Sequence, residues 1–318
     1  MIHTRDLART FTTKSGPVEA VRCLDLDVEA GELVAFLGPN GAGKSTTLRM
    51  LTTLLLPTSG SAVVAGRDVV ADPRGVRRRI GYVGQGHAAG AGQYVGDELV
   101  NQGRLYGLGK AEARSRADEL MAELELEGLD RREAAHLSGG QQRRLDIAMG
   151  LIHRPELLFL DEPSTGLDPH SRANLWAHIA RLREAYATTI VLTTHYLDEA
   201  DDVAERVIVI DHGSVIADGT PDELKGKVSG DLVLLETASE EDARAAAAVV
   251  EAVPSAHSVD TAGAAVRMRV ERGDAVLPEV LRAVDARGLE LRTVQVHRPS
   301  LDDVFLTLTG RSLRESDR

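Results

Sequence analysis

GPNGAGKST, residues 38–46, follows the short apolar run LVAFL at 33–37 and precedes the helix-forming segment TLRML. The stretch fits the pattern G-x-x-x-x-G-K-S/T without a gap, and strand, glycine loop and helix stand in the order that this pattern requires. Glycines let consecutive backbone N–H groups converge on a phosphate, and the helix dipole adds a smaller attraction. The stretch therefore predicts a phosphate-binding loop in an α/β fold rather than an ordinary glycine turn.

Each residue of this loop is a candidate ligand of a nucleotide. Lys44 is expected to reach the outer phosphates, and the hydroxyl of Ser45 is expected to bind Mg²⁺. The convergent N–H groups of the loop are expected to contribute most of the binding. The candidate nucleotide-binding residues of the loop are Gly38, Pro39, Asn40, Gly41, Ala42, Gly43, Lys44, Ser45 and Thr46.

Polar side chains follow two further apolar runs, as in buried parallel strands that carry chemistry at their carboxyl ends. LLFLDEP at 157–163 contains Asp161, the expected partner of Mg²⁺, and Glu162, which can face an attacking water. TTIVLTTH at 188–195 ends in His195, whose imidazole can hydrogen-bond the terminal phosphate and hold Glu162 in place. An acidic pair that only begins a turn and a structural histidine are the simpler alternatives. The glycine loop in the same chain favours the catalytic interpretation.

LSGGQQRRLD, residues 137–146, predicts the start of a second helix whose N-terminus is suited to bind an anion. Ser138 can cap the helix, and Gly139 and Gly140 let the backbone approach a ligand. Because a long helix-forming segment precedes it, we expect Ser138 to lie well away from Lys44 in one chain. The two motifs predict a head-to-tail homodimer, in which Ser138, Gly139 and Gly140 of one copy cover the phosphate that Lys44 of the other copy holds.

The sequence between Gln85 and Leu137 is rich in helix-forming residues. Within it, one helical face is marked by Ala113, Ala117, Leu120 and Leu124. After the strand-like run RVIVIDHG at 206–213, the chain is expected to turn through ADGTPDEL. We expect an α/β domain over 1–227, with a helical subdomain at about 86–150.

From about residue 228 the pattern restarts as strand, helix, strand, helix, strand and helix. This order predicts a small α+β domain at 228–310 without a glycine-rich site of its own, followed by a tail at 311–318. We expect the small domain to serve as a homodimer contact or a regulatory element.

The composition excludes several classes of protein. A net charge of -12 and a sequence pI near 5.3 argue against nucleic acid as a partner. The single cysteine, Cys23, cannot form an internal disulfide or a multi-thiolate metal site, which fits a reducing cytoplasm. The opening MIHTRDLART lacks the apolar core of a signal peptide, and no apolar window is long enough for a membrane helix. If the protein acts at a membrane, we therefore expect it to do so through a partner protein.

Six ordered motifs give the chain a resemblance to the nucleotide-binding subunits of ABC transporters over roughly residues 4–225. The resemblance implies a P-loop NTPase core with a helical signature subdomain, ATP and Mg²⁺ as cofactors, and ATP hydrolysis as the activity. The motifs are the loop at 38–46, Gln85 in GYVGQ, LSGGQ at 137–141, the acidic pair Asp161-Glu162, STGLD ending at Asp168, and His195.

The resemblance also implies a role for each motif. Glu162 is the general base, an effect typically worth about 10²–10⁴ in rate, and Gln85 contacts the metal or water and reports to the membrane partner. Asp168 couples the two sites of the dimer, and Phe11 in LARTF stacks on adenine unless it is a core phenylalanine. The implied catalytic residues are Glu162, His195 and Gln85, the implied metal ligands are Ser45, Gln85 and Asp161, and the loop is joined in nucleotide binding by Phe11, Ser138, Gly139, Gly140, Gln141 and Asp168.

Four longer segments resemble the daunorubicin-resistance (DrrA) family of ATPases, and together they extend the resemblance to nearly the whole chain. This family implies a separately encoded integral membrane permease, a peripheral position on the cytoplasmic face of the cell membrane, and efflux of an antibiotic or other hydrophobic drug. A lipid, polysaccharide or peptide is the alternative cargo, because nothing in this subunit contacts cargo. The segments lie at 143–169, 192–201, 209–225 and 300–310.

A non-transport ABC ATPase is the rival class. Repair ATPases place a very long coiled coil between the loop and the signature, and the stretch here is far too short. Ribosome-associated factors carry two cassettes, and a single one is visible. Both observations favour a transporter subunit.

The stretch GHAAGAGQYVGDELV at 86–100 departs from the family pattern, which has an apolar-Thr turn and a Glu-Asn-Leu helix start at this place. Because the family uses this region against the membrane subunit, the departure bears on the identity of the partner and not on ATP chemistry. We interpret the glycine and alanine run, with His87, as a mobile loop.

Overall fold

The computed structural model describes residues 1–14, 16–226, 230–253 and 256–310. The chain divides into two compact units, of which the first is Met1–Thr220 and the second begins at Pro221. The expected boundary at 227 differs because helix α8 (Pro221–Gly226) contacts α11 (Leu301–Thr309), the last helix of the second unit. Among the described residues, no helix combines the length and the apolar character needed to cross a bilayer.

A six-stranded sheet in the order β10-β9-β3-β8-β7-β6 forms the centre of the first unit. Strands β6, β7, β8, β3 and β9 run parallel, and β10 pairs antiparallel with β9. Every residue of β3, β7 and β8 is buried, as the apolar runs predict. The strands are β3 (Leu33–Leu37), β6 (Ile80–Val83), β7 (Leu157–Asp161), β8 (Thr189–Thr194), β9 (Arg206–Asp211) and β10 (Ser214–Gly219). The expected turn after β9 therefore contains a strand.

The strand register brings the ends of β3, β7 and β8 to one edge of this sheet. Leu37 lies beside Thr194, and Asp161 lies beside Thr193. The residues that follow these strands, including Gly38, Glu162 and His195, therefore meet at the same edge.

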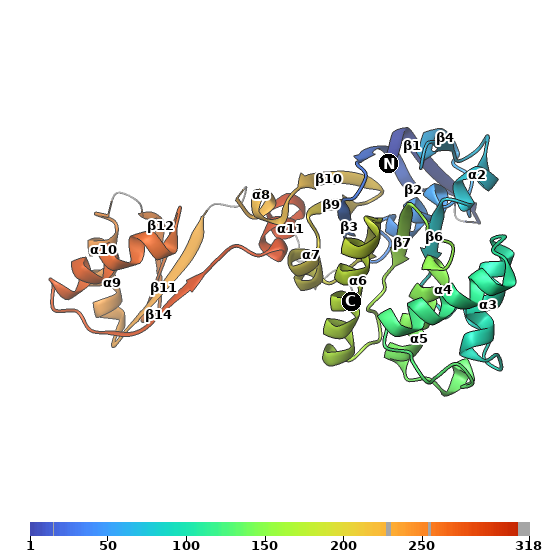
Figure 1. Ribbon diagram of the computed structural model, residues 1–318. Helices are drawn as coiled ribbons and strands as arrows, with labels where there is room; N and C mark the ends of the chain where they lie inside the picture. The colour runs from blue at the N-terminus through green and yellow to red at the C-terminus, as the bar shows by residue number, and fades with distance from the viewer. Residues whose placement is uncertain (15, 227–229, 254–255, 311–318) are drawn as a thin grey trace. The chain divides into compact units, whose positions relative to one another are not determined.

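A second, antiparallel sheet in the order β2-β1-β4-β5 completes the core of this unit (Figure 1). Helix α1 (Lys44–Leu51) contacts β2, β4 and β7, so it packs between the two sheets. The buried cluster around it includes Ile2, Phe36 and Phe159. The strands are β1 (Ile2–Thr13), β2 (Gly16–Val28), β4 (Ser59–Val64) and β5 (Arg67–Asp68).

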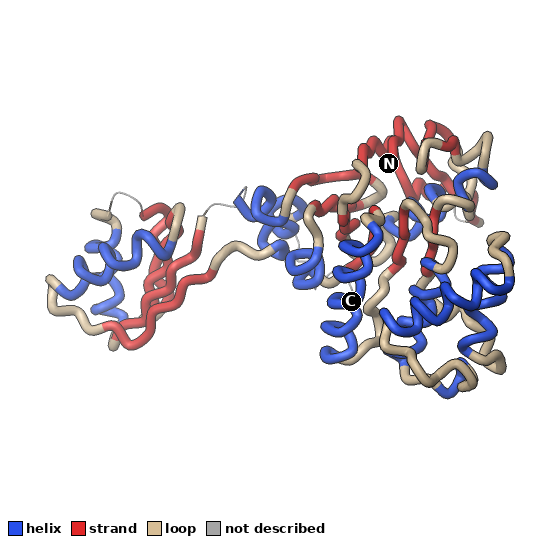
Figure 2. The backbone as a smooth tube through the Cα atoms, in the orientation of Figure 1, coloured by secondary structure: helices blue, strands red, loops and turns tan. Residues whose placement is uncertain are grey.

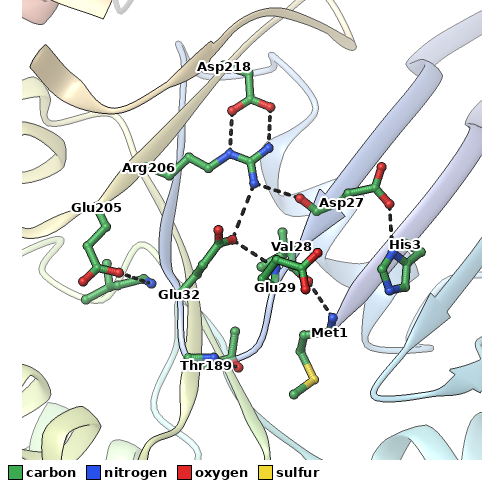
Figure 3. A network of polar contacts seen from close by, with 12 residues as sticks. Met1, His3, Asp27, Val28, Glu29, Glu32, Thr189, Glu205, Arg206 and Asp218 are labelled. Atoms are coloured by element: carbon green, nitrogen blue, oxygen red, sulfur yellow. Dashed lines mark hydrogen bonds and ion pairs between the residues drawn. The ribbon is translucent and has the colours of Figure 1, made fainter. Parts of the chain in front are cut away.

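A polar network joins this second sheet to the amino ends of β3 and β9 (Figure 3). Arg206 donates from Nε and Nη2 to the Asp218 carboxylate, both at 2.7 Å, and from Nη1 to the Asp27 carbonyl at 2.8 Å. The hydrogen bonds with Asp218 raise the pKa of Arg206, so the guanidinium stays charged. The Met1 ammonium donates to the Val28 carbonyl at 2.6 Å and fixes the start of β1.

Helices α3, α4 and α5 gather to one side of the parallel sheet (Figure 1). The predicted face of α4 is confirmed, because Ala113, Ala117, Leu120 and Leu124 are all buried. Helix α5 also contacts β6 and α6, which joins the helical part to the sheet. The helices of this unit beyond α1 are α2 (Pro73–Arg77), α3 (Val95–Leu105), α4 (Lys110–Glu123), the short 3-10 helix Ala134–His136, α5 (Gly139–Leu151), α6 (Pro169–Tyr186) and α7 (Leu197–Val203).

The second unit has its own four-stranded antiparallel sheet, in the order β12-β13-β11-β14 (Figure 2). Helices α9 and α10 contact the sheet and each other, over a core that includes Val233, Met268 and Val280. The predicted alternation of strands and helices is found, with one additional strand, β12. The elements are β11 (Asp231–Thr237), α9 (Glu240–Val250), β12 (Ala256–Ala262), β13 (Ala265–Val270), α10 (Gly273–Asp285) and β14 (Leu291–His297).

Candidate nucleotide-hydrolysis site

The glycine loop joins β3 to α1 as the sequence predicts, and two of its glycines are required by close backbone approach. A Cβ atom at Gly38 would lie 2.1 Å from the Ile210 carbonyl oxygen. At Gly43, where φ is +108°, a Cβ atom would lie 2.5 Å from the Ala20 carbonyl oxygen. No larger residue fits at either position without moving the backbone.

Lys44 is buried at the first position of α1. Its Nζ donates to the carbonyl oxygens of Gly38 at 2.6 Å and Pro39 at 3.0 Å, and it lies 4.0 Å from Glu162 Oε1. The ammonium is therefore held between the loop and the acidic strand end. Around it, Asn40 and Gly41 are exposed, Thr46 is half-buried, and Pro39, Ala42 and Gly43 are buried.

Three oxygen-bearing or amide side chains gather at Asp161 from separate elements. Ser45 Oγ donates to Asp161 Oδ1 at 2.9 Å, and Gln85 Nε2 donates to Ser45 Oγ at 3.3 Å. Thr193 Oγ1 donates to the same Oδ1 at 2.7 Å. Asp161 is fully buried, and its Oδ2 has no hydrogen-bond partner among the described residues.

This donor set fits Mg²⁺, which prefers carboxylate and hydroxyl oxygens and takes most of its remaining ligands from water and substrate phosphates. The unpartnered Asp161 Oδ2 is the observation that supports the fit. No group of three or more His, Cys, Asp or Glu residues that could hold a metal ion is found in the part of the chain that the structure describes. A site that borrows ligands from a nucleotide does not need such a cluster.

Glu162 follows β7 in a left-handed backbone conformation, with φ +47°. Its N–H donates to Thr193 Oγ1 at 2.9 Å, and Thr165 Oγ1 donates to its Oε2 at 3.2 Å. His195 Nδ1 lies 3.4 Å from Oε1. The neighbouring His195 and, to a smaller degree, Lys44 hold the pKa of Glu162 below its usual 4.5, so the carboxylate is ionised and can accept a proton.

The signature helix α5 begins at Ser138, as predicted. Ser138 Oγ accepts from Gln141 N at 3.3 Å, and Gln141 Oε1 accepts from Ser138 N at 3.0 Å, which completes a capping box. Ser138 and Gly139 are exposed, and Gly140 is half-buried beside Ser171. None of these hydrogen bonds reaches the loop at 38–46.

Asp168 and Phe11 lie outside the contacts of the acidic strand end. Asp168 caps α6, accepting from Ser171 N at 3.0 Å and from Ser171 Oγ at 2.6 Å, and these hydrogen bonds lower its pKa. Phe11 lies half-buried on β1, with the Arg9 guanidinium 4.7 Å above its ring, and it is not part of the buried core.

The segment after Gln85 is anchored, which corrects its interpretation as a mobile loop. His87 Nδ1 lies 3.0 Å from Asp146 Oδ2, and Ala88 N donates to Asp146 Oδ1 at 2.8 Å. Asp146 is buried on α5. Backbone hydrogen bonds also join Ala91 and Gln93 to residues 134–135. The segment is thus attached to the signature helix and to the turn that precedes it.

Two residues of this site, Thr193 and Arg143, were not predicted from the sequence. Thr193 contacts both acidic residues, and Arg143 on α5 donates to backbone carbonyls at the ends of β6 and β7. The position of Thr193 at a strand end, two residues before His195, could have indicated a role in the site. Arg143 lies among charged residues just after the LSGGQ motif, and nothing in the local sequence indicates that its side chain is buried.

Comparisons with known proteins agree with this geometry. Residues 21–165 match the family model described as "ABC transporter", and residues 219–309 match "ATP-binding protein DrrA1-3-like, C-terminal domain". The chain is 44% identical over 300 residues to the daunorubicin resistance ATP-binding protein DrrA3 of Streptomyces coeruleorubidus, covering 94% of each chain. It is 45% identical over 298 residues to the daunorubicin/doxorubicin resistance ATP-binding protein DrrA of Streptomyces peucetius, covering 92% of this chain and 88% of that one.

Among solved structures, the fold is similar to the dimeric post-hydrolysis state of the ATP-binding cassette MJ0796 bound to ADP and Pi. The TM-score is 0.64 at 26% identity, over 69% of this chain and 98% of the other. The similarity thus spans that cassette almost completely.

Proposed function

Since this chain belongs to the ATP-binding proteins of ABC transporters and hydrolyses ATP, we propose that it powers the efflux of an antibiotic or another hydrophobic drug. The observation that carries the proposal is the match along nearly the whole chain, second unit included, to relatives named for daunorubicin and doxorubicin resistance. The proposal includes a separately encoded membrane permease as the partner and a peripheral position of this chain on the cytoplasmic face of the cell membrane.

The residues at the acidic strand end would divide the work of hydrolysis. Lys44 neutralises charge on the outer phosphates, and the loop N–H groups orient them. Glu162, ionised at neutral pH, accepts the proton of the attacking water, and His195 holds the carboxylate in place. Ser45 and Asp161, with Gln85 beside them, would hold Mg²⁺, which stabilises developing charge on the phosphates when bound.

The active form in this proposal is a head-to-tail homodimer. Ser138 and Gly139 are exposed at the positive end of α5, where they are free to face the phosphates bound by a second copy. The dimeric cassette MJ0796 supports this arrangement by analogy. Asp168 and Phe11, both away from the acidic strand end, are proposed to act at the dimer contact and on adenine respectively.

A transport assay tests the drug proposal. If a neighbouring reading frame encodes a multi-span membrane protein, cells carrying it with this chain should accumulate less daunorubicin than cells carrying it with the Glu162→Gln variant. Equal accumulation would exclude this drug. The same assay with a labelled lipid, polysaccharide or peptide would then decide among the alternative cargoes. The ATPase activity of the purified chain is expected whichever cargo is exported.

For the second unit we propose a role in homodimer contact or regulation. Each unit has its own buried core, so a chain ending at Thr220 should fold. Its ATPase activity and its support of transport should be measured separately. A truncated chain that matches the full chain in both would refute the proposed role.

A further inference from the structure

Arg143 lies on α5, five residues after Ser138, and its side chain is buried with 5% of its surface exposed. Each of its nitrogen groups donates to a different backbone carbonyl. Nε donates to Pro163 O at 2.7 Å, Nη2 to Asp161 O at 3.1 Å, and Nη1 to Gly84 O at 2.7 Å. One side chain of the signature helix therefore holds the ends of β6 and β7 together.

Two of these carbonyls stand on either side of Glu162, and the third belongs to the residue before Gln85. The backbone of Glu162 is in a left-handed conformation, which residues other than glycine rarely adopt and which persists only where surrounding contacts impose it. Thr193 fixes the N–H of Glu162 from β8. From α5, Arg143 fixes the peptide before Glu162 through the Asp161 carbonyl and the peptide after Pro163 through the Pro163 carbonyl.

We propose that Arg143 is a positioning residue for ATP hydrolysis, which holds the Glu162 carboxylate where it can reach the attacking water. The planar guanidinium suits this task, because it offers several N–H groups in a fixed fork, whereas a lysine offers a single flexible ammonium. The buried Asp146, whose Oδ2 lies 4.0 Å from Arg143 Nη1, balances the charge.

The first test compares Arg143→Gln and Arg143→Lys with the matched control Arg144→Gln in the full-length chain. Arg144 is the next residue on the same helix, but it contacts Asn174 and Glu125 instead of the strand ends. We expect Arg143→Gln to lower kcat by about 10²-fold with KM for ATP unchanged, since small displacements of catalytic groups cost this much. Arg143→Lys should retain an intermediate kcat, and the control should match the wild type.

The second test asks whether Arg143 acts through Glu162. In a Glu162→Gln background, where the base is already lost, Arg143→Gln should reduce single-turnover hydrolysis little further, because residues that act as a unit are not additive. The same fold-loss in both backgrounds would overturn the proposal. So would wild-type kcat in Arg143→Gln, or a loss confined to ATP binding. If Arg143→Gln does not unfold cooperatively on heating, Arg143→Lys carries the test, and wild-type kcat there overturns the proposal.

Discussion

Ser45 and Asp161, separated by 116 positions in the sequence, are joined by a 2.9 Å hydrogen bond from the hydroxyl to Oδ1. The bond links the first turn of α1 to the end of β7, and the second carboxylate oxygen is buried without a partner among the described residues. Two oxygen atoms are thereby placed together before any metal binds.

Asp161→Asn should weaken Mg²⁺ binding, because the amide removes the charge at the buried position. We expect the Mg²⁺ concentration for half-maximal ATPase activity to rise by about 10–100-fold, the usual range for losing a supporting contact of a metal site. A magnesium titration of the purified variant measures this shift. An unchanged midpoint would mean that Asp161 does not hold the metal.

Gly43→Ala should abolish ATP binding, because the added Cβ atom would lie 2.5 Å from the Ala20 carbonyl oxygen. Gly107→Ala, which lies outside the loop, is the matched control: its φ is also positive, at +95°, but nothing lies within 4 Å of the added atom. The control should cost only about 1–2 kcal/mol of backbone strain. Binding of a fluorescent ATP analogue separates the two, and equal affinities would refute the steric argument.

His153 should make the protein less stable as the pH falls through the range 6.5 to 4. Burial lowers the pKa of His153 from 6.5 to about 4, against the effect of its 2.9 Å hydrogen bond to the Ile80 carbonyl. Between these pH values the unfolded chain binds a proton that the folded chain does not. The free energy of unfolding therefore decreases as the pH is lowered. At about 1.4 kcal/mol for each pKa unit, the full loss approaches about 3 kcal/mol.

Urea unfolding at several pH values measures this loss. His153→Phe keeps an aromatic ring beside Tyr106, whose ring stacks on His153 at 3.7 Å, but it cannot titrate. Its stability should therefore change less steeply between pH 6.5 and 4. Equal slopes for the variant and the wild type would assign the pH dependence to other groups.

Local sequence predicted the parallel strands β3, β7, β8 and β9, but not β6, because fully buried strands are continuous apolar runs; the strict spacing of Gly38 and Lys44 predicted the loop. It did not predict β1 and β2. Asp6 and Cys23, with φ +50° and +41°, lie in these strands where their register shifts, and such bulges break the two-residue alternation. Ser258, with φ +50°, has the same effect in β12.

The roles of Thr193 and Arg143 were beyond local sequence for a different reason. Their contacts with Asp161 and Glu162 join residues that lie far apart in the chain. Only the strand order and the packing of α5 against β6 bring these side chains to the acidic pair.

The central claim is that one chain supplies an incomplete site, since Lys44 and Glu162 share contacts while the exposed Ser138 does not join them. The most direct test is the molar mass of purified Glu162→Gln in solution with ATP and Mg²⁺, measured by light scattering, beside the same variant carrying Ser138→Arg. We predict a stable dimer for the single variant and a monomer for the double variant. A Glu162→Gln chain that remains monomeric while saturated with ATP would contradict the account.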